Sequence, residues 1–252
     1  MKYFILASGS KGNATIIKGP HTKLLIDLGL SLKEYKERLN VFNLEEDRVF
    51  AVLFTHKHGD HITTQFNKVA NGNIYAPANT LPFAAPYTEV KPYLPFIINE
   101  FKITPLPTSH DVSDSVGYIL ETDEYKVVYM TDTGYISTRN LELMKNADLY
   151  IMESNHSPGL LLKTNRPFDL IQRILSDEGH LSNEACAHYL AELVGPRTKH
   201  IVLAHLSEEA NTPEAALETF DKVFRKYGID QSKLKVVTAN QYVPISGELN
   251  EN

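Results

Sequence analysis

The sequence predicts an α+β fold in which two β-sheets pack face to face and helices cover their outer faces. Short apolar runs typical of buried strands recur along the whole chain, and helical patterns separate several of the later ones. The chain has 252 residues, 42% of them hydrophobic, and no proline- or glycine-rich linker divides it. We therefore expect residues 1–252 to form a single domain with a substantial core.

The expected strands are apolar runs bounded by turn residues. In chain order they cover residues 3–7, 14–18, 23–27, 49–54, 101–106, 116–121, 126–131, 149–153, 200–204 and 235–238. Three helices have recognisable start signals: a capping box at Ser31, a cap at Ser182 before a segment that runs to Leu193, and Thr212-Pro213 before a segment that ends near Tyr227. The proline-containing stretch 77–95 is expected to cross the surface.

Composition excludes some classes of protein. A formal net charge of −6 argues against binding nucleic acid through a broad basic surface, although an anionic substrate held at a metal centre stays open. Cys186 is the only cysteine, which excludes an internal disulfide and fits a reducing cytoplasm. The first apolar run is too short for a signal peptide, and no segment is expected to span a membrane.

Residues 55–61 read Thr-His-Lys-His-Gly-Asp-His and are the most informative segment of the chain. Four metal-ligand side chains, His56, His58, Asp60 and His61, follow an expected strand end. In extended backbone, His56 and His58 point to the same side and can share one ion, while the intervening glycine turns the next two ligands toward a second. A histidine-rich surface loop is the plain alternative, but the spacing indicates a dinuclear metallohydrolase.

Three later strand ends supply candidates for the remaining ligands. His110, Asp132 and His205 each follow an apolar strand closely. Taken singly, either histidine could be an ordinary loop or core residue, but the histidine-rich segment 55–61 strengthens the assignment of both as ligands. We therefore assign His56, His58 and His110 to one ion, Asp60, His61 and His205 to the other, and Asp132 as the carboxylate bridge.

Further side chains are candidates for roles beside the metals. His180 stands in a Gly-His-Leu-Ser string just before an expected helix and is a candidate general acid or base, unless it merely caps that helix. With the metal ligand Asp60, it makes up the expected catalytic pair. Lys163, Arg166 and Arg173 precede His180 and could hold phosphates beside the scissile bond, although a solvated basic face explains them equally well.

Together these strings resemble the metallo-β-lactamase superfamily and, within it, the WalJ/YycJ group of small nuclease-like proteins. Besides the histidine-rich string, the resemblance lies in residues 6–13, 25–29, 109–118, 131–135, 153–156, 179–184 and 204–207, and so covers nearly the whole chain. It implies a four-layer αββα sandwich with the metals at one edge between the sheets. It also implies that Asp27 organises the metal-binding loop without touching a metal.

The resemblance further implies activity on nucleic acid. The strings Gly-His-Leu-Ser at His180 and Ala-His-Leu-Ser at His205 are similar to the paired late histidines of ribonuclease Z and ribonuclease J relatives. This implies that His180 assists proton transfer and that His205 binds metal. The β-CASP insertion of ribonuclease J relatives and the exosite arm of ribonuclease Z are not recognisable, so strand recognition is expected to come from shorter loops.

The predicted function is that of a metal-dependent phosphodiesterase. The resemblance implies a 5′-to-3′ exonuclease, acting on DNA more than RNA and serving DNA repair in the cytoplasm. A hydroxide bound by two divalent ions would attack the phosphate, and His180 would protonate the leaving 3′ oxygen. Zinc and manganese are the foremost candidate ions and iron a further one, because histidine and carboxylate ligands suit all three.

Four alternatives stay open. A ribonuclease of the Z or J kind stays open, because the late histidine pair is similar to the pair in those enzymes. A lactonase or thioester hydrolase of this fold is disfavoured by the late histidine pair. An iron-dependent oxidoreductase of this fold is disfavoured because diiron versions usually place a carboxylate where His58 stands, although mononuclear iron versions keep the histidine. A binding module without activity is disfavoured by the intact ligand set.

Overall fold

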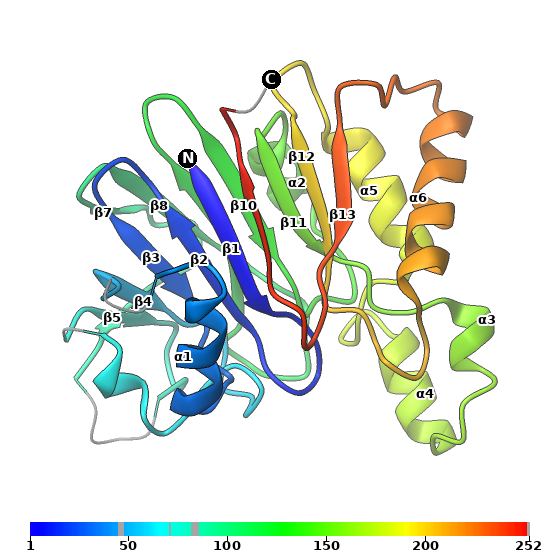
Figure 1. Ribbon diagram of the computed structural model, residues 1–252. Coiled ribbons are helices and arrows are strands. Elements are labelled where there is room, and N and C mark those ends of the chain that lie inside the picture. The colour runs from blue at the N-terminus through cyan, green and yellow to red at the C-terminus, as the bar shows by residue number, and fades with distance from the viewer. Residues whose placement is uncertain (45–47, 71, 82–85, 251–252) are drawn as a thin grey trace.

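The computed structural model describes residues 1–44, 48–70, 72–81 and 86–250. Two seven-stranded β-sheets lie face to face, and helices cover their outer sides (Figure 1). This arrangement is the four-layer αββα sandwich that the sequence predicted.

The first sheet contains both ends of the described chain. Its order is β14-β1-β2-β3-β4-β5-β6, antiparallel from β14 to β3 and parallel from β3 to β6. The strands are β1 (Lys2–Ala7), β2 (Ala14–Lys18), β3 (Lys23–Ile26), β4 (Ala51–Leu53), β5 (Ile74–Ala76), β6 (Thr88–Glu89) and β14 (Ile245–Glu248).

The second sheet has the order β13-β12-β11-β10-β9-β8-β7. Its strands are β7 (Phe96–Ile98), β8 (Phe101–Pro107), β9 (Val116–Glu121), β10 (Lys126–Met130), β11 (Leu149–Glu153), β12 (His200–Ala204) and β13 (Lys235–Thr238). Strands β10 to β13 are parallel. Their carboxyl ends therefore meet at one edge of the sandwich.

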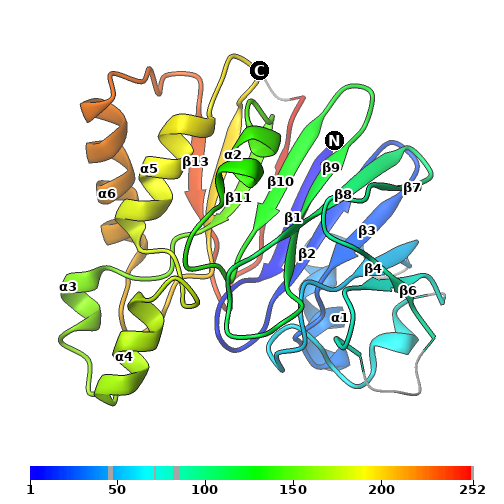
Figure 2. The ribbon, with the colours of Figure 1, turned by 180° about the vertical axis from the view of Figure 1, so that it is seen from behind.

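Helices enclose the outer face of each sheet. Helix α1 (Leu32–Asn40) packs on the first sheet, and α2 (Thr138–Met144), α5 (Asn183–Leu193) and α6 (Pro213–Lys226) pack on the second (Figure 2). Helices α3 (Pro158–Leu161) and α4 (Phe168–Leu175) lie beyond the edge where the parallel strands end, and a short 3₁₀ helix spans Phe66–Lys68. Buried apolar side chains fill three layers, one between the sheets and one under each helical face.

The predicted helix starts are confirmed. The Ser31 Oγ accepts from the Glu34 backbone, and the Glu34 carboxylate accepts from the Ser31 backbone, which completes the capping box. Ser182 and Thr212 cap α5 and α6 in the same way through their hydroxyl oxygens. Each cap satisfies backbone N–H groups that a helix leaves unpaired at its start.

Several expected bounds differ from the structure. The strand expected over 49–54 is shorter, as β4, and the stretch 77–95 contains β6, although residues 82–85 lie outside the described part. Cys186 is buried in α5, as expected of a small core residue. Within the described residues, no helix is both long and apolar enough to cross a membrane.

Candidate metal centre

The predicted ligands meet at one edge of the sandwich. The histidine-rich loop follows β4, and His110, Asp132 and His205 follow β8, β10 and β12. Because these four strands end at the same edge, loops far apart in the sequence deliver their side chains to one place (Figure 1). Gly29 allows the closest approach, since a Cβ there would collide with the carbonyl oxygen of Asp60.

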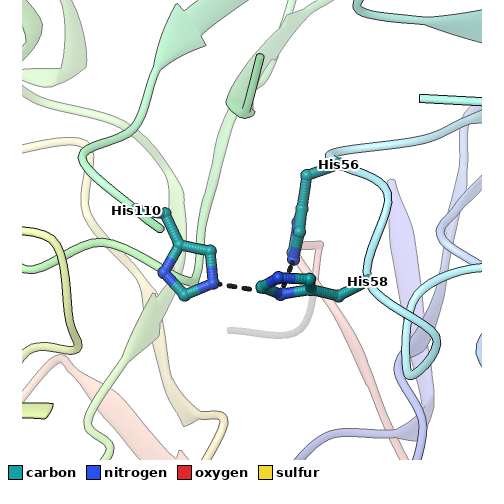
Figure 3. A group of neighbouring side chains, drawn as sticks. All are labelled: His56, His58 and His110. Carbon is teal, nitrogen blue, oxygen red and sulfur yellow. Dashed lines mark hydrogen bonds between the residues drawn. The ribbon is translucent and has the colours of Figure 1, made fainter. Parts of the chain in front are cut away.

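The first group consists of His56, His58 and His110. Their ligand atoms all lie within 4.8 Å of one another. The His58 Nδ1 is 3.1 Å from the His56 Nε2 and 3.3 Å from the His110 Nε2, and Figure 3 shows the three rings converging. Burial lowers the pKa of His56 well below its usual value and that of His110 to about 4. Both rings are therefore neutral at pH 7, which is the state a metal ligand requires.

The second group consists of Asp60, His61 and His205, whose ligand atoms also lie within 4.8 Å of one another. Asp132 stands between the two groups. Its carboxylate oxygens lie 3.3 Å from the His61 Nε2, 3.5 Å from the His205 Nε2 and 3.9 Å from the His110 Nε2. Asp132 therefore lies close to residues of both groups.

Two buried atoms of this cluster show that it fits divalent cations. The Asp132 Oδ2 and the His205 Nε2 make no hydrogen bond with the described residues. Buried polar atoms nearly always have a partner, so a carboxylate oxygen and an imidazole nitrogen left without one need an explanation. A metal ion would coordinate both, and a set of histidines and aspartates suits zinc, manganese or iron.

The second group holds protons that a metal would displace. Burial disfavours the charged form of His205, but the carboxylates of Asp132, Asp60 and Glu153 outweigh it and raise the pKa of His205 to about 10. For His61, Asp27 and Asp132 likewise outweigh burial and raise its pKa well above the usual value. Because a metal binds the neutral ring, loading this group must release protons.

Asp27 lies behind the metal-binding loop and contacts two of its residues. Its side chain is fully buried. The Oδ1 accepts from the Thr55 backbone N–H at 2.8 Å, and the Oδ2 lies 2.8 Å from the His61 Nδ1. A proton on that Nδ1 leaves the Nε2 lone pair directed at the cluster, which is how carboxylates commonly fix metal-binding histidines.

Three residues of the site have a backbone conformation that is uncommon outside glycine. Asp27, Asp132 and His205 have φ angles of 58°, 56° and 54°. Such residues cluster at functional sites, where surrounding structure holds them in place. Here the hydrogen bonds of Asp27, and the 2.8 Å bond from the His205 N–H to the Ser8 Oγ, supply that restraint.

Glu153 is a central residue that the sequence analysis did not assign. It is fully buried at the end of β11. Its Oε1 lies 2.6 Å from the His180 Nδ1 and 3.1 Å from the His205 Nδ1. Its Oε2 accepts from the backbone N–H groups of Thr133 and Leu181, both at 3.1 Å. Burial opposes ionisation, but the two histidines outweigh it and lower the pKa of Glu153 to about 2.

Glu153 therefore connects the expected metal ligand His205 with the expected acid His180. The ligand atoms of Asp132, Glu153, His180 and His205 also lie within 4.8 Å of one another, so proximity alone leaves His180 a possible ligand. A carboxyl side chain directly at a strand end, as at Asp132, was the signal in the sequence that could have identified Glu153.

The metal centre opens into a cleft of about 420 Å³. His180 lines it, with Arg166 and Arg173 on the side of α4. Arg173 pairs with Asp111, and the Arg166 Nε donates to Glu209 at 3.0 Å. Lys163, the third basic residue expected here, is exposed and is not among the side chains that line the cleft.

Comparison with known proteins agrees with this fold. The model of the beta-lactamase superfamily domain matches residues 22–206, which is most of the chain. The chain therefore belongs to the metallo-β-lactamase superfamily. The solved structure of the metallo-beta-lactamase fold protein YhfI from Bacillus subtilis superposes with a TM-score of 0.72 at 18% identity, covering 98% of this chain and 99% of that one.

Curated relatives confirm the resemblance to the WalJ/YycJ group. The chain is 35% identical over 229 residues to exodeoxyribonuclease WalJ of Streptococcus pneumoniae, covering 85% of each chain. It is 31% identical over 267 residues to exodeoxyribonuclease YycJ of Bacillus anthracis, covering 96% of this chain and 99% of that protein.

Proposed function

We propose that this protein is a metal-dependent 5′-to-3′ exodeoxyribonuclease. What supports this most is the arrangement of the site, in which Asp132 lies close to histidines of two adjoining metal-ligand groups, and the site opens, beside His180, into a cleft with two arginines. Both curated relatives carry the name exodeoxyribonuclease, which favours DNA as the substrate.

The side chains of the site divide the chemistry among them. A pair of divalent ions, when bound, supplies a nucleophile from water at neutral pH and stabilises charge on the phosphate. The two histidine groups would hold these ions, and Asp132 lies where it can bind both. Asp60 and His205 would hold the second ion, so we count Asp60 among the residues on which the chemistry depends.

His180 is suited to protonate the leaving 3′ oxygen. Its Nδ1 is held by the buried carboxylate of Glu153 at 2.6 Å. Because Glu153 takes the Nδ1, the other nitrogen, Nε2, is left to hold the proton that is donated. His180 is partly exposed in the cleft, whereas Glu153 is fully buried, so the proton lies on the substrate side.

Arg166 and Arg173 give an acidic chain a local site for phosphates. A guanidinium carries five N–H donors, and the pairs with Glu209 and Asp111 use only part of them. The remaining donors can bind phosphates that flank the scissile bond, and the two carboxylates hold the side chains at the cleft in advance.

Labelled oligonucleotides test the proposal directly. The protein should be incubated with 5′-labelled and 3′-labelled DNA, with the same sequences as RNA, and with circular DNA, under zinc, manganese and magnesium. A 5′-to-3′ exonuclease releases the 5′ label early in a mononucleotide or very short product, shortens 3′-labelled DNA progressively and spares the circle. Asp132→Ala is the matched inactive control.

Other outcomes point to the alternatives. Cutting of circular DNA at a comparable rate would mean an endonuclease, and preference for RNA would mean a ribonuclease. If no nucleic acid is turned over while a lactone or thioester is hydrolysed rapidly, the proposed function is wrong.

A further inference from the structure

An exposed tyrosine lies beside the metal centre, in the turn between β13 and β14. Tyr242 is 54% exposed and lines a cavity of about 290 Å³. Ser207 lines both this cavity and the metal-centre cleft, so the two adjoin. Ser8, which also lines the tyrosine cavity, accepts a hydrogen bond from the backbone of the expected metal ligand His205.

The turn that carries Tyr242 is fixed before any ligand binds. The Asn240 Oδ1 accepts from the backbone N–H of Tyr242 at 2.7 Å. The neighbouring Gln241 Oε1 accepts from the Lys11 N–H at 2.9 Å, and its Nε2 donates to the Gly12 carbonyl at 3.0 Å. A ligand that binds the ring therefore has little backbone ordering to oppose it.

The faces of the Tyr242 ring are not taken by its nearest cation. The Lys11 Nζ is 2.6 Å from the Tyr242 hydroxyl oxygen and 5.4 Å from the ring centre. The difference between these two distances is about the distance from the centre of a phenol ring to its hydroxyl oxygen, so the ring centre, the oxygen and the Nζ lie nearly on one line. The ammonium therefore lies beyond the hydroxyl, near the ring plane, and covers neither face.

The charges around this tyrosine favour a neutral planar ligand over a phosphate. The Lys11 Nζ pairs with the Glu208 carboxylate at 2.7 Å, and Glu208 also lines the cavity. A phosphate would lose attraction to the paired ammonium and be repelled by the carboxylate. The face of a nucleic-acid base carries no such charge and stacks on aromatic rings whatever its sequence.

We propose that Tyr242 is a stacking platform for an unpaired base of the strand that is cut at the metal centre. This inference rests on the proposed nuclease function and deepens it. A base that stacks here must be out of a duplex, so a single-stranded end is preferred over a blunt one. The subsite also lies on the Ser207 side of the cleft, whereas the phosphate contacts of Arg173 come from α4.

Abasic substitution tests the stacking contact. Single-stranded DNA carrying one abasic position, moved stepwise along the strand, should be assayed with wild type, Tyr242→Ala and Tyr242→Phe. Loss of one base–aromatic stack weakens binding by about 5- to 150-fold. For wild type, KM should rise by that factor when the abasic site falls at the one position whose base stacks on Tyr242, and kcat should stay unchanged. For Tyr242→Ala, KM should already be raised by that factor on intact DNA, and an abasic site at that position should raise it no further. Tyr242→Phe should behave as wild type.

A fluorescence measurement keeps the test independent of turnover, and a control variant checks its specificity. A 2-aminopurine base at the sensitive position should lose fluorescence on binding wild type and keep it with Tyr242→Ala, because stacking quenches it. Tyr227→Ala is the matched control: Tyr227 is 50% exposed but follows the far end of the 14-residue helix α6, about 20 Å from the cavity. It should leave KM unchanged.

The outcomes separate this inference from the proposed function. If the protein degrades DNA but no abasic position raises KM, or if Tyr242→Ala shows the same abasic penalty as wild type, the stacking inference is wrong and the nuclease function stands. If Tyr242→Phe is as impaired as Tyr242→Ala, the hydroxyl and not the ring face matters, which also overturns it. If no nucleic acid is bound or cut, both proposals fail. Should Tyr242→Ala not fold, the wild-type abasic scan, the fluorescence and Tyr242→Phe still decide.

Discussion

Replacing Glu153 with glutamine should remove most activity while preserving the fold. The carboxylate accepts two backbone N–H groups at Oε2 and contacts His180 and His205 at Oε1. A glutamine amide has only one oxygen. If that oxygen keeps the backbone donors, the NH₂ group faces the Nδ1 of both rings, and each ring must move its proton to Nε2.

The two histidines would then fail in different ways. In the metal-bound state, a proton fixed on the His205 Nε2 would block the nitrogen that must bind the ion beside Asp132. His180 loses the carboxylate that holds its Nδ1 at 2.6 Å. Removing such a partner typically costs about 10- to 100-fold in metal affinity or activity, and a general acid contributes about 10²- to 10⁴-fold. Because one substitution disturbs both, we expect kcat to fall about 10³-fold with weaker binding of one ion.

The assay combines nucleotide release from 5′-labelled DNA with elemental analysis of the purified variant. Glu184→Gln is the matched control, since this glutamate is 71% exposed in the first turn of α5 and should change neither quantity. Circular dichroism checks that each variant is folded. If Glu153→Gln keeps its metals and a kcat within about threefold of wild type, Glu153 does not govern the two histidines as argued here.

Three further predictions concern the metals and protons of the site. The protein should bind two divalent ions per chain, and His58→Ala or Asp132→Ala should abolish activity; a stoichiometry that never exceeds one ion under any loading condition would falsify the dinuclear assignment. His180→Ala should lower kcat by about 10²- to 10⁴-fold while metal content and KM stay near wild type, and loss of metal as in His205→Ala would contradict its role as an acid. Metal affinity should rise with pH below about 10, because the pKa of His205 is raised to about 10 and its proton must leave on binding; chelator competition at several pH values measures this, and a flat profile would refute it.

The location of the metal cluster was predictable because local signals coincide with topology. Each expected ligand directly follows an apolar run, and parallel strands bring their carboxyl ends to one edge. Glu153 escaped notice because its role depends on His180 and His205, which lie 27 and 52 residues further along the chain. No sequence spacing reveals such a contact.

Most of the elements that the sequence analysis missed are short or lack a cap, and α2 is an exception. Strands β5, β6 and β7 have only two or three residues, too few for an alternating pattern. Helix α4 starts after Pro167 without a side-chain cap, whereas Ser137 before α2 was a usable signal.

Proximity in sequence was a poor guide among the basic residues. On α4, Leu170, Arg173 and Ile174 stand three and four positions apart and so share the face that lines the cleft. Lys163 lies after α3, outside that helix, and its exposed position gives it no place among these side chains.

The pairing of β14 with β1 sets the order in which the site can be assembled. Strand β14 pairs with β1 at the edge of the first sheet. The Gln241 side chain hydrogen-bonds to the backbone of Lys11 and Gly12, which lie 230 and 229 positions earlier in the sequence. The same loop places the Asn13 side chain 3.1 Å from the His61 Nε2. Contacts of such high contact order form slowly and only once both segments exist. During synthesis, the loop of residues 11–13 beside His61 therefore lacks its hydrogen bonds to Gln241 until Gln241 has left the ribosome.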